Sequence, residues 1–211
     1  MVAGLFGMFF LGVLYLQRIL GYDAITTGLA FLPVSVLIGT LSLGVSARLN
    51  LRFGPRATLL PGLVLVAVAL AYFSRAPVDG DYVADVLPVV VLLGAGAGLV
   101  FPSLTTISMS GVLPGDAGLA SGVVNTSMQV GGAFGLAVLA TLATDRSEAL
   151  RSQGDSVASA LTGGYQLAFL VAAGLIGVAI VLATFVLQSD RPIDQREREH
   201  AHGREPQPEP A

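Results

Sequence analysis

The apolar parts of this sequence contain neutral polar side chains at helical spacing, and these groups could contact a ligand. Ser121, Asn125 and Gln129 recur every four residues, so a helix would carry them on one face. In an apolar environment such groups either hydrogen-bond to a neighbouring helix or line a wet cavity, and both interpretations are open for Asn125 and Gln129. For hydroxyl groups such as those of Ser103 and Thr106, a bond back to a carbonyl one turn earlier is favoured.

Several classes of chemistry are excluded by residues that the sequence lacks. There is no cysteine, which removes disulfides, cysteine-ligated zinc and thiol catalysis. The two histidines, His200 and His202, lie in a polar tail without a third ligand nearby, so we expect no metal site and no cofactor. The apolar runs hold neither a Ser and His dyad nor a pair of aspartates, which argues against an enzyme.

The composition is that of a membrane protein. Of the 211 residues, 54% are hydrophobic and 12% are charged, whereas a soluble domain carries about 25% charged residues. The segment 188–211 holds 10 of the 25 charged residues, so the remaining 187 residues cannot cover a soluble surface. The formal net charge of −3 offers no basic region for nucleic acid. Because 188–211 is polar and contains proline, we expect it to be a disordered tail.

The charged residues divide the body of the chain into six candidate spans. A helix crosses the hydrocarbon core with roughly 20 residues, and the apolar runs do not alternate in polarity as the strands of a barrel would. The predicted fold class is therefore all-α and integral to the membrane. The helices are expected at about 1–17, 26–47, 57–74, 86–108, 118–142 and 163–187.

The arginines predict which way the spans are oriented. With six spans, both termini lie on one side, and that side collects seven arginines against four on the other. Cytoplasmic loops carry the excess of basic residues. We therefore expect a multi-pass protein of the plasma membrane with both termini in the cytoplasm.

Small residues and prolines indicate how the spans pack. Glycines four residues apart let membrane helices approach closely. Prolines at 33 and 102 lie inside their spans and favour kinks, because each removes a backbone hydrogen bond. The glycine pairs are Gly94 and Gly98, Gly118 and Gly122, and Gly131 and Gly135.

A short basic segment, 47–56, separates the second and third spans. It carries Arg48, Arg52 and Arg56 around Gly54 and Pro55. One interpretation is a basic cytoplasmic turn that follows the charge bias of inner loops. The other is a conformational latch, in which arginine side chains bond the exposed carbonyl ends of neighbouring helices in one state only.

Three stretches resemble the C-terminal half of a major facilitator superfamily transporter, and the likeness is greatest to the fourteen-span drug/proton antiporters of bacteria. Residues 15–33 resemble the first crossing of that half and the start of the next helix, and 99–142 resemble its penultimate pair of helices. In the basic segment, Leu49, Arg52 and Gly54 match the family's signature loop, whereas Leu51 stands where the family has an acid.

The resemblance covers about 1–190 and implies one six-helix half of a carrier whose two halves rock against each other. It also implies that the first and fourth spans line a substrate path, with Tyr15, Gln17, Phe101 and Thr106 as candidate residues. The second and fifth spans would meet the other half. The candidate residues of that seam are Ser121, Asn125, Gln129, Gly131, Gly132 and Gly135.

The predicted function is a segment of a secondary active transporter, with proton-coupled efflux of drugs or other hydrophobic compounds. Apolar walls with few polar contacts suit a small amphipathic substrate. The expected partners are the lipid bilayer, an absent N-terminal half or a second copy of the chain, and protons bound through that half. A membrane scaffold or interaction subunit that does not transport is the alternative, and it is compatible with the same composition.

Overall fold

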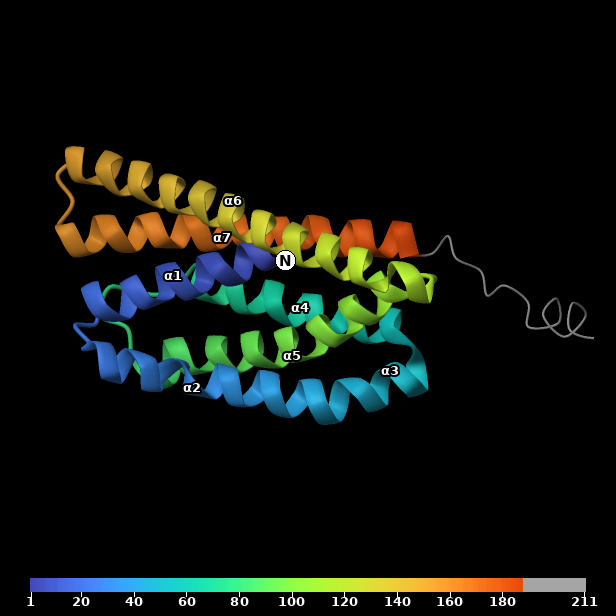
Figure 1. The fold of residues 1–211 in the computed structure, drawn as a ribbon. Coiled ribbons are helices and arrows are strands. Elements are labelled where there is room, and N and C mark those ends of the chain that lie inside the picture. The colour runs from blue at the N-terminus through green and yellow to red at the C-terminus, as the bar shows by residue number, and fades with distance from the viewer. Residues whose placement is uncertain (188–211) are drawn as a thin grey trace, which may run out of the picture.

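A computed structural model describes residues 1–187, and every regular element within them is helical (Figure 1). Five helices are long and apolar enough to cross a membrane, while the apolar helix Val2–Arg18 is shorter. The all-α membrane fold class is thus confirmed. The α-helices are α1 (Val2–Arg18), α2 (Ala24–Thr40), α3 (Ala47–Phe53), α4 (Pro55–Phe73), α5 (Leu87–Met109), α6 (Ala117–Ser152) and α7 (Val157–Leu187). The π-helical turns η1 (Leu41–Ser46) and η2 (Tyr82–Val86) and the 3-10 turn η3 (Pro114–Asp116) complete the order.

The second span is longer than the charges suggested, because α2, η1 and α3 form one helix, Ala24–Phe53. Residues 47–53 contain no glycine or proline, so nothing in this segment stops the helix at residue 47. The helix ends at Gly54, whose φ of +85° is a conformation that favours glycine. Pro55 then occupies the first position of α4, where a backbone N–H would have no partner within the helix.

α6 also continues beyond its expected end at residue 142. It carries Asp145 and Arg146 in its last turns and reaches Ser152. Charged residues of this kind are compatible with a helix once it has left the hydrocarbon. Gly154, with a φ of +101°, makes the turn into α7.

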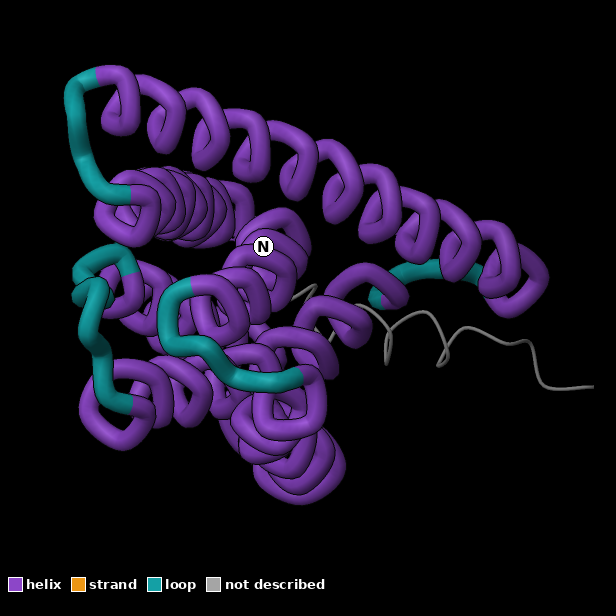
Figure 2. The backbone as a smooth tube through the Cα atoms, turned by 90° about the vertical axis from the view of Figure 1, so that its left-hand side faces the viewer, coloured by secondary structure: helices purple, strands orange, loops and turns teal. Residues whose placement is uncertain are grey.

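Successive long helices run in alternating directions, so the connecting segments gather at two ends of the bundle (Figure 1). We call the end with loops 19–23, 74–81 and 153–156 the α6–α7 end, and the opposite one the α3 end. α4 packs against α5 and α7, α1 against α6 and α7, and α2 against α5. α1 begins near the middle of the bundle, whereas α6 and α7 extend past its start (Figure 1). Figure 2, a view onto the α6–α7 end, shows α6 crossing obliquely over the other helices.

An aromatic column forms part of the core near the α6–α7 end. The Tyr15 ring of α1 meets Phe73 of α4 edge-on, with centroids 5.3 Å apart. Phe73 in turn lies 4.7 Å from the ring of Phe169 on α7. All three side chains are buried, so this column ties α1, α4 and α7 together.

Glycines on α5 allow its neighbours to approach closely. A Cβ at Gly96 would lie 2.7 Å from the Gly62 carbonyl oxygen of α4. On another face of the helix, Cβ atoms at Gly94 and Gly98 would lie 3.1 Å and 3.3 Å from backbone atoms of α2. The close apposition predicted from Gly94 and Gly98 is confirmed, and α2 is the helix that approaches them.

Candidate functional site

Tyr15, predicted to line a substrate path, lies inside the bundle. Its side chain is completely buried, and its hydroxyl donates a hydrogen bond to the Pro77 carbonyl oxygen at 2.6 Å. The Gln166 side chain of α7 donates to the neighbouring carbonyl of Ala76 at 2.9 Å. Tyr15 and Gln166 thus fasten the loop 74–81 to α1 and α7. The sequence signals neither bond, because the acceptors are carbonyls in a distant loop.

The other three path candidates are exposed or half-buried. Gln17 is exposed near the α6–α7 end of α1. On α5, Phe101 is half-buried and Thr106 is exposed. The Thr106 hydroxyl donates to the Pro102 carbonyl at 2.8 Å, which is the bond one turn back along the helix that was predicted for the hydroxyl groups. Gln17 thus lies on α1, whereas Phe101 and Thr106 both lie on α5.

The polar stripe of α6 is an open face. Ser121, Asn125 and Gln129 are exposed along the part of the helix that extends past the start of α1. A shallow groove follows the same part of the helix, and Cβ atoms added at Gly118, Gly122 or Gly131 would meet no atom within 4 Å. In the part of the chain that the structure describes, this face has no partner. The close packing predicted from Gly118 and Gly122 is therefore not met by any described helix.

Two glycines assigned to the seam between halves have a different neighbour. A Cβ at Gly135 would lie 2.7 Å from the Ala3 Cα atom, and one at Gly132 would lie 3.2 Å from the Val2 side chain. Both glycines are buried against α1 of the same chain. Gly131 differs from both, because it is exposed and a Cβ built there would meet no atom within 4 Å.

The basic segment is mostly helical and is tied to α5 through neutral groups. Leu49 and Arg52 belong to α3, Gly54 makes the turn, and Arg56 lies in the first turn of α4. The Arg52 guanidinium carbon lies 5.2 Å from the ring centroid of Phe53. Sequence reasoning missed Asn50, whose side-chain oxygen accepts a hydrogen bond from the buried Ser103 hydroxyl at 2.9 Å. This bond links α3 to α5 beside Leu51, which occupies the position of the family's acid.

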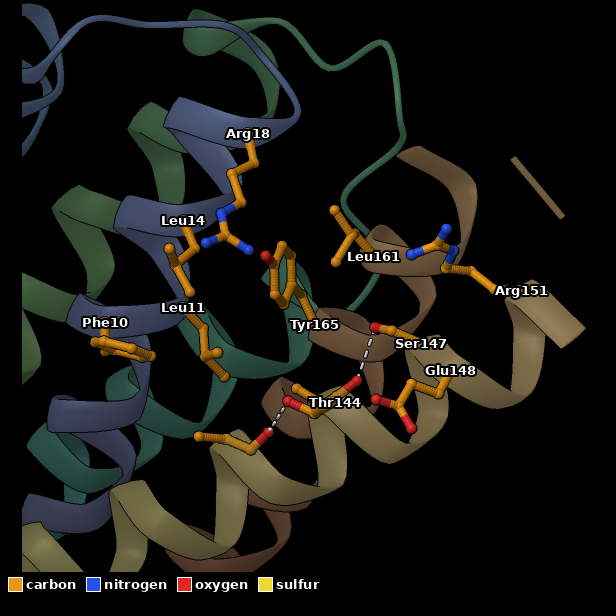
Figure 3. Close-up of a pocket in the computed structure, with 12 residues that line it drawn as sticks. Phe10, Leu11, Leu14, Arg18, Thr144, Ser147, Glu148, Arg151, Leu161 and Tyr165 are labelled. Carbon is orange, nitrogen blue, oxygen red and sulfur yellow. Dashed lines mark hydrogen bonds between the residues drawn. The ribbon is translucent and has the colours of Figure 1, made fainter. Parts of the chain in front are cut away.

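Two adjoining cavities between α1 and α6 were not anticipated. One, of about 490 Å³, is lined by apolar side chains only. The second, of about 230 Å³, reaches the α6–α7 end and is lined by residues of α1, α6 and α7 (Figure 3). Phe10 and Leu14 line both cavities. The lining of the apolar cavity is Phe6, Phe9, Phe10, Val13, Leu14 and Leu136.

A pattern in α1 could have indicated the apolar cavity. Its phenylalanines at 6, 9 and 10 and the aliphatic residues at 13 and 14 recur at helical spacing. All of them are exposed or partly exposed, so this side of α1 points away from the core. In a wholly apolar helix, however, such spacing is equally typical of a face turned to lipid.

The fold, an all-α membrane bundle with an open face on α6, is that of a multi-pass membrane protein, and comparison with known sequences gives its family. The family model of the Major Facilitator Superfamily matches residues 1–136. The chain belongs to this family, which points to a transporter rather than an enzyme and places the helices in lipid.

Individual relatives are named for resistance and export. The chain is 37% identical over 193 residues to the puromycin resistance protein pur8 of Streptomyces alboniger, covering 88% of this chain and 38% of the relative. It is 40% identical over 134 residues to the cephamycin export protein CmcT of Amycolatopsis lactamdurans, covering 64% and 27%. It is 30% identical over 178 residues to the lincomycin resistance protein LmrB of Listeria monocytogenes, covering 82% and 37%. The chain thus spans well under half of the length of these relatives.

Proposed function

We propose that this chain is a segment of a secondary active transporter that exports drugs or other hydrophobic compounds. The observation that carries the proposal is the similarity, over most of the chain, to proteins named for antibiotic resistance and antibiotic export. The open α6 face and the apolar cavity beside α1 agree with it, because a carrier needs both a partner for this bundle and a place for its cargo.

The proposed cargo is a small amphipathic compound. The exposed side of α1 offers aromatic and aliphatic contacts with few polar groups, and Gln17 lies at its α6–α7 end. Phe101 and Thr106 contribute to the path from α5. We leave Tyr15 out of the proposed path because its side chain is buried and its hydroxyl is bonded to Pro77.

The proposed seam with the other half is the exposed stripe of α6. It consists of Ser121, Asn125 and Gln129, and Gly131 is exposed on another side of the same helix, whereas Gly132 and Gly135 are already packed against α1. The partner is an N-terminal half or a second copy of the chain. Protons drive export through an acid in that partner, since the apolar runs of this chain contain no carboxylate.

The proposed location is the plasma membrane, with both termini in the cytoplasm and the α6–α7 end outside. The arginines of the basic segment then lie on the cytoplasmic side, in agreement with the charge bias of inner loops.

We propose that this chain is part of a longer carrier, the full-length carrier. Transport is tested in that protein. In a drug-sensitive bacterium, it is expected to lower the accumulation of amphipathic drugs, and a protonophore is expected to abolish the effect. Asn125→Ala and Gln129→Ala are expected to reduce export, whereas Gly174→Ala, on an exposed part of α7, serves as the control.

Two results would contradict the proposal. Equal drug accumulation with and without the full-length carrier would favour a membrane scaffold instead. Unchanged export of every tested compound by both α6 variants would remove Asn125 and Gln129 from the seam.

A further inference from the structure

Three charged side chains line the cavity at the α6–α7 end, together with apolar residues. Arg18 reaches in from α1 and Arg151 from the end of α6, on opposite sides of Tyr165 and Leu161 (Figure 3). Glu148 lies one turn before Arg151 and is the one acid of this lining. The three side chains give the cavity a formal charge of +1.

The arginines keep hydrogen-bond donors available. Among the described residues, none of the three charged groups has an ion pair within 4 Å. The Ser147 hydroxyl donates to the Ala143 carbonyl at 2.7 Å, and the Thr144 hydroxyl donates to the Ala140 carbonyl at 3.0 Å. These hydroxyl protons are already used within α6, and the Arg18 guanidinium also lies beside the Tyr165 hydroxyl (Figure 3). The donors left for a ligand are the N–H groups of Arg151 and those of Arg18 that do not face Tyr165. A ligand must therefore bring acceptors.

The apolar cavity adjoins the charged one, since Phe10 and Leu14 line both. We propose that the two cavities form one site for an amphipathic anion. Its carboxylate, sulfonate or phosphate is attracted by the positive charges of Arg18 and Arg151, and its apolar body lies among the phenylalanines of α1.

The proposed site names a substrate class for the exporter, and this part of the inference rests on the proposed function. The same chemistry is offered by an exported organic acid and by the phosphate of an anionic lipid. Arginine suits either source, because its planar guanidinium can bind two oxygen atoms at once.

Binding is measured on the full-length carrier in nanodiscs by equilibrium dialysis, with empty nanodiscs as the blank. Anilinonaphthalene sulfonate is the anionic probe, and N-phenyl-naphthylamine, which has the same rings without the sulfonate, is the neutral one. The test variants are Arg18→Gln, Arg151→Gln and Glu148→Gln. Arg146→Gln is the matched control, because Arg146 lies on the same helix, is exposed and does not line the cavity.

We expect each arginine variant to bind the sulfonate about tenfold more weakly, which corresponds to the loss of one charge-assisted hydrogen bond. Glu148→Gln should bind it more tightly, because a negative charge is removed beside the anion. Arg146→Gln should behave as the unaltered carrier, and the neutral probe should bind all variants alike. Arg151→Lys, which keeps the charge, should retain part of the affinity and shows that the cavity is intact.

The lipid composition of the nanodisc distinguishes the two possible sources of the anion. If phosphatidylglycerol in place of phosphatidylcholine removes the arginine-dependent binding, a lipid headgroup occupies the site. If the binding persists, the site serves free organic anions.

The inference is overturned if the sulfonate binds no better than to empty nanodiscs. It is also overturned if both arginine variants bind like the unaltered carrier, or if the neutral probe weakens in parallel. Export of neutral drugs is measured separately in cells. The proposed anion site can therefore be contradicted while the proposed export function is supported, and the export function can be contradicted while the anion site is supported.

Discussion

At the scale of single residues, Tyr15 has a positioning role. Its ring packs on Phe73 and its hydroxyl holds the loop 74–81 through Pro77. Tyr15→Phe keeps the ring but leaves the carbonyl without its donor. We expect this change to lower the free energy of unfolding by about 1 kcal/mol, measured as a lower melting temperature of the full-length carrier in detergent.

The control for Tyr15 is Tyr72→Phe. The Tyr72 hydroxyl also donates to a backbone carbonyl, that of Ala84 at 3.1 Å, but its side chain is exposed. Loss of this bond should cost less, because water or lipid headgroups can replace it. Equal melting temperatures for Tyr15→Phe and the unaltered carrier would show that the Pro77 bond does not stabilise the loop.

The contact between Gly135 and Ala3 leads to a second prediction at this scale. The added methyl group of Gly135→Ala would collide with the Ala3 backbone, so α1 and α6 must move apart. We expect a loss of about 1–3 kcal/mol in stability, typical of overpacking. Gly174→Ala, where no atom lies within 4 Å, should be neutral or slightly stabilising. Thermal unfolding that does not distinguish the two variants would contradict the close approach of α1 to α6.

At the scale of the element, Asp23 caps the long helix that starts at Ala24. Its carboxylate accepts a hydrogen bond from the Thr26 backbone N–H at 2.7 Å. Bonds from the Thr26 side chain and backbone lower the pKa of Asp23 below its usual value. A lowered pKa in the folded state means that the cap contributes stability above the unfolded value of about 3.9. This contribution is lost as the pH falls through the folded pKa.

This pH dependence is measured as the difference in melting temperature between the unaltered carrier and Asp23→Asn. Asparagine can still cap the helix but does not titrate in this range. The difference should be constant above about pH 5 and should shrink below about pH 4. A difference that stays constant down to pH 3 would show that the Asp23 charge does not contribute.

At the scale of the whole molecule, the alternating helices place all connecting loops at two ends. The proposed orientation puts the α6–α7 end outside the cell and the α3 end inside. Because the chain has no cysteine, single cysteines report on each end without background from this chain. We expect a membrane-impermeant maleimide to label Gln153→Cys on intact cells and to label Asp116→Cys only after the cells are opened. The opposite pattern would reverse the topology.

Hydropathy and charge predicted the all-α membrane fold, because both are local properties of the chain. They were less successful at helix ends. α3 and the end of α6 continue beyond the first charged residues, since a helix does not stop where the hydrocarbon stops. The glycine spacing at 94 and 98 indicated close packing correctly, but only the structure shows that α2 is the partner.

The sequence by itself therefore determined that this is a helical membrane protein of a transporter family, with its charged residues outside the apolar runs and a polar stripe on α6. Only the tertiary structure decided that Tyr15 is buried, that Gly135 meets α1 while Gly131 stays open, and that Arg18 and Arg151 share a cavity. The physical reason is that lipid and protein core are equally apolar. Hydropathy alone cannot distinguish the buried side of a membrane helix from its exposed side, and the contacts that do so join residues far apart in the chain.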